Sequence, residues 1–142
     1  MSSISIKGIL AGNGFNLIAS VVVSTAAIFM MTRGATGALP LEQQRVVIAT
    51  SSYARFGAPL VAAGILIASG YIAAALAAKA ELLNGTLATL LSVVSGIVSL
   101  ATLSDVVIEE VMIRTAISVA VAPFLGMLGG YLCRQRVRRA RG

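Results

Sequence analysis

The chain has no histidine, no tryptophan and a single cysteine, Cys133, among its 142 residues. Without histidine it lacks the side chain that most often acts as a general base near neutral pH, and a single cysteine excludes an internal disulfide. Charged residues are also scarce, at 11% of the sequence, whereas a soluble domain carries about 25%. So few charges cannot cover a water-soluble globule, and we therefore expect most of the chain to lie in lipid.

Four long stretches of the sequence contain no Asp, Glu, Lys or Arg, and the shortest holds 19 residues. About 20 residues of helix cross a hydrocarbon core of about 30 Å. The first stretch is longer than a signal-peptide core of about 7–15 residues, so we expect it to remain as a helix. The sequence predicts an all-α, integral membrane four-helix bundle of two antiparallel hairpins, forming a single domain. The predicted spans are residues 9–32, 56–78, 84–104 and 114–133, followed by a basic tail at 134–142.

Positive charge is unequally divided between the two ends of such a bundle. Four spans place both termini on one side, and that side carries seven of the eleven Lys and Arg residues. Because the more basic side of a multi-pass protein faces the cytoplasm, we predict cytoplasmic termini (N-in/C-in) and a location in the bacterial inner membrane. The tail is expected to contact anionic lipids, with a specific acidic partner as the alternative. Its cations are Arg134, Arg136, Arg138, Arg139 and Arg141.

Small residues recur at every fourth position of the predicted helices. Positions four apart lie on one face of a helix, and small residues there let two helix backbones approach closely in lipid. We therefore predict a compact bundle that packs along these faces. The predicted helix-packing residues are Gly8, Gly12, Asn16, Ser20, Gly70, Ala74, Ser92, Gly96, Ala122, Gly126 and Gly130.

Two asparagines, Asn13 and Asn16, are the most polar side chains within the first predicted span. An amide group without a partner in hydrocarbon costs a few kcal/mol, so these side chains should face protein or water. Two interpretations remain, namely hydrogen bonds to another helix and the lining of a polar path. A third asparagine, Asn84, follows the short link between the second and third spans and is predicted to cap the helix that begins there.

Two features are predicted on the outer side of the membrane. Residues 33–55 form the longest connection, within which Pro40 is predicted to start a short helix through 41–50. This helix either rests on the membrane interface or docks a partner. The other outer connection carries an acidic cluster that is either solvated or recognises a partner or an ion. The cluster consists of Asp105, Glu109 and Glu110.

The segment that joins the second and third spans resembles a hairpin of small, uncharacterised four-helix bacterial membrane proteins. Here Gly70-Tyr-Ile-Ala-Ala74 is followed by Leu82-Leu-Asn-Gly85. In those proteins a Gly-Gly-Tyr-x-Ala-Ala segment leads through a basic link to Leu-Leu-His-Gly. This chain departs from the pattern with Ser69 in place of the first glycine and Asn84 in place of the histidine. The resemblance covers about 20 of the 142 residues and implies a fold but no activity.

No arrangement of residues typical of catalysis is present in the sequence. There are no paired carboxylates within the uncharged stretches and no nucleophile with an evident activating base. Met30 and Met31 are adjacent, but without histidine or further spaced methionines they are interpreted as packing residues rather than a copper site. We therefore predict no enzyme activity, no catalytic residues, no metal site and no cofactor.

The favoured interpretation is a non-catalytic accessory or scaffold subunit of a membrane protein complex. Its expected partners are the lipid bilayer and other membrane subunits or further copies of the chain, with no nucleic acid. One alternative is a small homo-oligomeric channel or transporter in which Asn13 and Asn16 line the path. The other is a lipid-binding membrane protein that uses the basic tail.

Overall fold

The described part of the chain is built from helices and contains no strand. A computed structural model describes residues 4–34, 40, 43, 46, 50–77, 80–101 and 108–140. The helices are α1 (Ile6–Gly34), the π-helical turn η1 (Tyr53–Gly57), α3 (Ala58–Ala77), α4 (Glu81–Ala101) and α5 (Ile108–Arg139). η1 leads directly into α3.

Within the described residues, four helical segments are long and apolar enough to cross a membrane, and they pack together. They are Ile6–Met31, Tyr53–Ala77, Glu81–Val98 and Thr115–Arg139. The prediction of an all-α, integral membrane four-helix bundle is thereby confirmed, and the fold is that of a multi-pass membrane protein.

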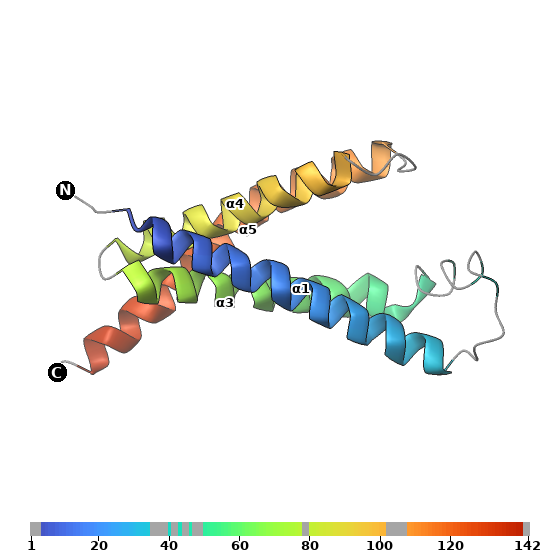
Figure 1. Cartoon of the computed structure of the whole chain (residues 1–142), viewed down its shortest axis with the longest axis horizontal. Coiled ribbons are helices and arrows are strands. Elements are labelled where there is room, and N and C mark those ends of the chain that lie inside the picture. The colour runs from blue at the N-terminus through green and yellow to red at the C-terminus, as the bar shows by residue number, and fades with distance from the viewer. Residues whose placement is uncertain are drawn as a thin grey trace.

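Successive helices run in opposite directions, so α1 with α3 and α4 with α5 form two hairpins (Figure 1). The four helices are close together at the end that carries both termini and the α3–α4 turn. Toward the other end the two hairpins diverge (Figure 1). We call these the closed end and the open end.

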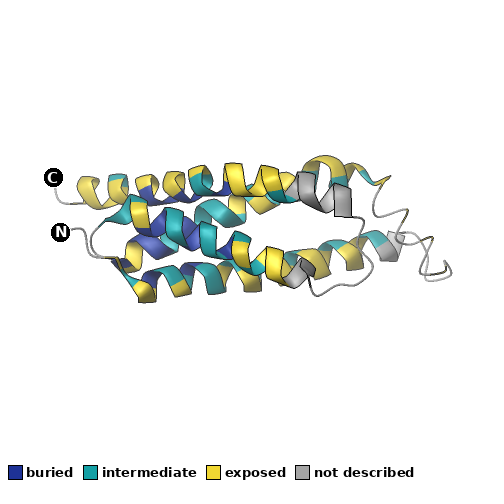
Figure 2. Ribbon diagram, turned by 90° about the horizontal axis from the view of Figure 1, so that it is seen from above, coloured by how far each residue is buried: buried dark blue, intermediate teal, exposed yellow. Residues whose placement is uncertain are grey.

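The core of the bundle lies at the closed end and consists of small side chains. Figure 2 shows the buried residues gathered in that half, while the outer parts of the helices are exposed. In lipid, burying a large apolar side chain against another gains little, so close backbone contact has to hold the helices. The buried apolar residues are Ala73, Ala74, Ala77, Ala88, Ala122 and Cys133, and the buried polar ones are Ser69, Asn84, Thr89 and Ser92.

Helices α3, α4 and α5 meet through glycines with almost no space between their backbones. A Cβ atom built on Gly126 would lie 2.5 Å from the carbonyl oxygen of Gly85, and one built on Gly85 would lie 2.5 Å from that of Gly126. Real Cβ atoms essentially never come so close, so only glycine fits without moving a helix. We call this set the glycine contact. It consists of Gly70, Gly85, Gly126, Gly129 and Gly130.

Helix α1 joins the closed end through a second close approach. A Cβ atom on Gly8 would lie 2.5 Å from the carbonyl oxygen of Ala73, and one on Gly12 would lie 2.7 Å from that of Ser69. The buried Ser69 hydroxyl donates a hydrogen bond of 2.8 Å to the carbonyl oxygen of Gly12. The α1–α3 hairpin is therefore held by both close packing and a buried hydrogen bond.

The α3–α4 turn is tied to the start of α1 by Asn84. Its side-chain oxygen accepts a hydrogen bond from the backbone N–H of Ser5, and its amide nitrogen donates to the carbonyl oxygen of Ala80. Ala80 has a φ of 54°, which allows the chain to reverse within the turn. The prediction that Asn84 caps α4 is wrong, because α4 already begins at Glu81. Asn84 instead satisfies a donor at the beginning of another helix.

Candidate functional site

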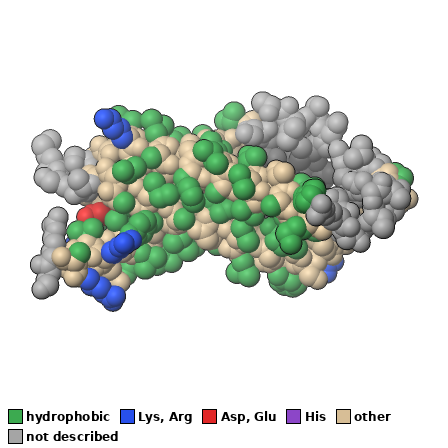
Figure 3. Space-filling view, turned by 60° about the horizontal axis from the view of Figure 1, so that its bottom comes forward, with side chains coloured by type: hydrophobic (Ala, Val, Ile, Leu, Met, Phe, Trp, Pro, Cys, Tyr) green, Lys and Arg blue, Asp and Glu red, His purple; other side chains and the backbone are tan. Residues whose placement is uncertain are grey.

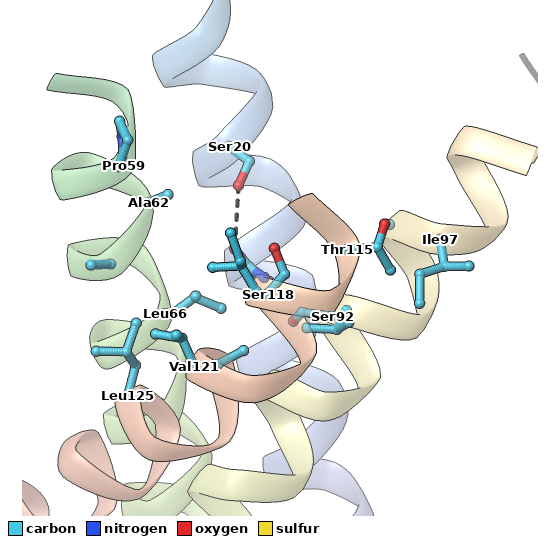
Figure 4. A pocket seen from close by; sticks show the side chains of 16 residues that line it. Ser20, Pro59, Ala62, Leu66, Ser92, Ile97, Thr115, Ser118, Val121 and Leu125 are labelled. Carbon is cyan, nitrogen blue, oxygen red and sulfur yellow. Dashed lines mark hydrogen bonds between the residues drawn. The ribbon is translucent and has the colours of Figure 1, made fainter. Parts of the chain in front are cut away.

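A cleft of about 430 Å³ lies between the two hairpins, on the open-end side of the core. All four helices contribute to its wall (Figure 4). Its deeper part is bounded by Leu66, Ser92 and Leu125, and its outer part by Pro59 and Ile97. Its volume falls within the range of about 300–1,000 Å³ that is usual for small-ligand sites.

Five polar side chains interrupt the otherwise apolar wall of the cleft, and none of its lining residues is ionisable. They come from three different helices, so they surround the space rather than line one face. Cavities of this composition bind ligands through apolar contact and use the few polar groups to fix orientation. The polar lining residues are Asn16, Ser20, Ser92, Thr115 and Ser118.

Hydrogen bonds fix the deep polar corner of the cleft. The Ser20 hydroxyl donates a bond of 3.2 Å to the Asn16 side-chain oxygen, one turn away on α1 (Figure 4). The Ser92 hydroxyl lies 2.8 Å from the Asn13 side-chain oxygen and 3.0 Å from the carbonyl oxygen of Ala88. Asn13 therefore links α1 to α4, whereas Asn16 contributes to the cleft.

The space for the cleft comes from small residues on its wall. Gly96 has no other heavy atom within 4 Å of the position that a Cβ would occupy. It was predicted to lie in a helix–helix contact, but it lines the cleft instead because α4 has already diverged from its neighbours there. The buried Ala122 lies opposite on α5.

A second, smaller cavity of about 260 Å³ lies between the outer halves of α1 and α3. It shares Ser20 and Ala62 with the cleft and is otherwise lined mainly by apolar residues. Tyr53 of η1 borders its outer part. The spaces inside the bundle are therefore concentrated toward the open end.

The predicted packing residues divide between the closed end and the cleft. Those at close contacts are Gly8, Gly12, Gly70, Gly126 and Gly130, with Ala74 and Ala122 buried beside them. Those on the wall of the cleft are Asn16, Ser20, Ser92, Gly96 and Ala122. Some of the predicted small residues therefore bring two helices into contact, and others leave room for the cleft.

Several contact residues were not singled out from the sequence. Gly85 and Thr89 lie one position beyond the pattern chosen on α4, and both face Gly126. The sequence pattern includes Gly130 but not its neighbour Gly129. A Cβ atom on Gly129 would lie 2.7 Å from the backbone nitrogen of Tyr71. The pair Gly129-Gly130 was itself the available signal, because two adjacent glycines in one helix permit close approach on two faces.

The basic residues at the end of α5 are exposed and extend beyond the buried Cys133. Arg136 donates a hydrogen bond of 3.0 Å to the Tyr71 hydroxyl of α3, and Gln135 donates one of 2.8 Å to the Tyr131 hydroxyl. Arg136 is therefore directed toward the bundle. The exposed cations on this segment are Arg134, Arg136, Arg138 and Arg139, and Arg141 lies outside the described residues.

Some predicted features of the outer side cannot be placed. Most of the connection at 33–55 lies outside the described residues, and so does Asp105; of the predicted helix at 41–50, only residues 43, 46 and 50 are described, and these are helical. The side chains of Glu109 and Glu110 also lie outside them. Within the part of the chain that the structure describes, no three His, Cys, Asp or Glu side chains are grouped so as to hold a metal ion.

Comparison with protein-family models, curated proteins and solved structures finds no match for this chain. The resemblance carried by residues 70–85 therefore stays a prediction from the sequence.

Proposed function

We propose that this chain is a non-catalytic accessory subunit of a membrane protein complex, and that it contributes a preformed binding cleft within the bilayer. The observation that supports this is the contrast between the two ends of the bundle. The glycine contact fixes the hairpins at the closed end, and their divergence leaves the cleft at the open end. A site held open by rigid contacts at its base needs little rearrangement to bind.

The chemistry of the cleft favours binding over reaction. Its polar groups are hydroxyls and one amide, which donate and accept hydrogen bonds but do not exchange protons near neutral pH. A subunit that holds a molecule for a neighbouring subunit needs no more than this.

The charge distribution supports a cytoplasmic closed end in the inner membrane of a bacterium. Lys7 and four arginines of α5 lie at that end, and Glu81 is the acidic residue described there. Figure 3 shows Lys and Arg side chains gathered mainly at the closed end, while Arg55 of η1 lies toward the open end. With this orientation the cleft opens toward the outer leaflet.

A homo-oligomeric channel or transporter is the second candidate, because hydroxyl groups line the cleft. The glycine contact closes the inner end of the single chain, so a continuous path would have to form between copies. The lining that favours this alternative consists of Asn16, Ser20, Ser92, Thr115 and Ser118.

Purification of the full-length protein from native membranes in mild detergent tests the accessory role. The expected result is a heteromeric complex of fixed composition. A lone symmetric ring that conducts solute in liposomes would refute the accessory role and support the channel.

A cleft-filling variant tests whether the cleft serves this complex. Gly96→Leu places a large side chain in the cleft, whereas Gly64→Leu places the same side chain at an exposed site on α3 with no other heavy atom within 4 Å of its Cβ position. Both changes raise helix propensity equally. We expect Gly96→Leu to assemble into the complex with impaired function and Gly64→Leu to behave as wild type. Equal function of the two variants would show that the cleft is not used.

A further inference from the structure

Two hydrogen-bond donors on the wall of the cleft have no partner among the described residues. The side-chain oxygen of Asn16 accepts from Ser20, but its amide nitrogen donates no hydrogen bond within the described part of the chain. The Thr115 hydroxyl, at the outer part of the cleft, also has no partner among those residues. An unpaired amide in hydrocarbon is unfavourable, so an occupant that carries an acceptor is favoured there.

The depth of Asn16 restricts which acceptor can reach it. The membrane-spanning segment of α1 is Ile6–Met31, and Asn16 lies within three residues of its middle, about 4 Å along the helix axis. The ester groups of ordinary phospholipids remain near the membrane surface with their headgroups, roughly 15 Å from the middle of the bilayer. An acceptor at the depth of Asn16 therefore belongs to a molecule without a surface-bound headgroup.

The size of the cleft suits a small molecule. On α5 the lining extends from Thr115 to Leu125, about 15 Å of helix length. The cleft volume of about 430 Å³ lies in the lower part of the range for small-ligand sites, about 300–1,000 Å³, and fits a ring with a hydrocarbon chain.

We infer that the cleft binds a neutral, headgroup-free lipid of the isoprenoid quinone class, with a carbonyl oxygen of its ring accepting a hydrogen bond from the Asn16 amide. The ring lies at the deep end, near Leu66 and Leu125, and the tail follows the cleft toward the open end. The absence of ionisable lining residues suits an uncharged ring. This inference rests on the proposed role of the cleft as a binding site.

Equilibrium binding to full-length protein in phosphatidylcholine nanodiscs tests the inference. The probes are a radiolabelled benzoquinone with a decyl tail and decylbenzene, which has a similar ring and tail but no carbonyl. We expect Asn16→Leu to weaken quinone binding about tenfold, the loss of one hydrogen bond, and to leave decylbenzene binding unchanged. Asn16→Gln, which keeps an amide, should retain more affinity than Asn16→Leu.

Two further variants control for space and folding. Gly96→Leu should abolish binding of both probes, and Gly64→Leu should bind both as wild type does. Asn16→Ala is a second variant in case Asn16→Leu does not fold, because alanine is favoured in helices. A shift of the quinone carbonyl stretch in the infrared spectrum of wild type, absent in Asn16→Ala, would show the hydrogen bond directly.

The inference is overturned if Asn16→Leu binds the quinone as tightly as wild type does, or if decylbenzene binds as tightly as the quinone. Displacement of the quinone by an equal concentration of diacylglycerol would assign the cleft to ester lipids instead. These results are independent of the accessory role. Quinone binding without a heteromeric complex would refute only the proposed function, and a complex without quinone binding would refute only the ligand.

Discussion

The side-chain oxygen of Asn84 accepts a hydrogen bond of 2.8 Å from the backbone N–H of Ser5, which lies 79 residues earlier in the chain. Asn84 is fully buried and also donates to the carbonyl oxygen of Ala80. One side chain thus connects the start of α1 to the α3–α4 turn. It ties the two hairpins together at the closed end, in addition to the packing of their helices.

Replacing Asn84 with alanine is expected to destabilise the bundle by about 1–3 kcal/mol, because the backbone N–H of Ser5 loses its acceptor. Thermal unfolding in detergent micelles measures the change. The matched control is Thr86→Val, since the Thr86 hydroxyl donates only to Leu82 within its own helix, at 2.9 Å. Similar stability losses in the two variants would contradict the role of Asn84 as a tie between helices.

The glycine contact predicts opposite effects for one substitution at two positions. Gly126→Ala is expected to destabilise by about 1–3 kcal/mol, because its Cβ would meet Gly85 and Thr89. Gly64→Ala, with open space around the Cβ position, is expected to stabilise by about 0.5–1 kcal/mol through helix propensity. Both are measured by unfolding in the same detergent. A Gly126→Ala variant as stable as Gly64→Ala would rule out the backbone contact.

The positive φ of Ala80 predicts that a glycine there is stabilising. The left-handed conformation costs an L-residue about 1–2 kcal/mol, and this cost exceeds the entropy that glycine loses on folding. We expect Ala80→Gly to raise stability by roughly 0.5–1 kcal/mol. Ala75→Gly lies at an exposed position inside α3. It carries the same entropy loss but relieves no backbone strain, so it should lower stability by about 1 kcal/mol. If both variants lost stability, the positive φ of Ala80 would be contradicted.

The contact between Asn13 and Ser92 predicts a measurable coupling between α1 and α4. Their side-chain oxygens are 2.8 Å apart. A double-mutant cycle with Asn13→Leu and Ser92→Ala should give a coupling energy of about 0.6 kcal/mol, and no more than about 1.7 kcal/mol. A cycle on Ser20 and Ser92, which no hydrogen bond joins, is the control. Additive single mutations at Asn13 and Ser92 would argue against the interhelical bond.

The position of both termini at the closed end, together with its basic residues, predicts a cytoplasmic C terminus. In a bacterial host, a green fluorescent protein fused to the C terminus should be fluorescent, and alkaline phosphatase fused there should be inactive. The reverse pattern would overturn the orientation and would place the opening of the cleft in the inner leaflet.

The sequence was sufficient to predict the four membrane helices, because uncharged stretches of that length have few other structures available in lipid. It could not predict where the hairpins diverge. Gly85 and Gly96 are eleven residues apart, about three turns, so they lie on nearly the same face of α4. Gly85 contacts Gly126, whereas Gly96 faces the cleft. Periodicity identifies a face of a helix but not the distance to the next helix.

The role of Asn84 shows a second limit. Short-range rules correctly placed a helix start near it but assigned its side chain to that helix. Its actual partner, the N–H of Ser5, belongs to a segment with no sequence signal that distinguishes it from other termini. The cleft was likewise predicted only in part. The sequence allowed Asn16 either to form a hydrogen bond to another helix or to line a polar path, and it did not distinguish between the two.

Three of the five residues in the glycine contact, Gly126, Gly129 and Gly130, belong to α5, which is synthesised after α3 and α4. While α5 is still inside the ribosome, Gly70 and Gly85 have no third backbone to pack against. The glycine contact is therefore completed only after α5 has entered the membrane. A chain that is released before residue 126 carries helices that are able to insert but lacks the close backbone contacts that α5 makes with α3 and α4.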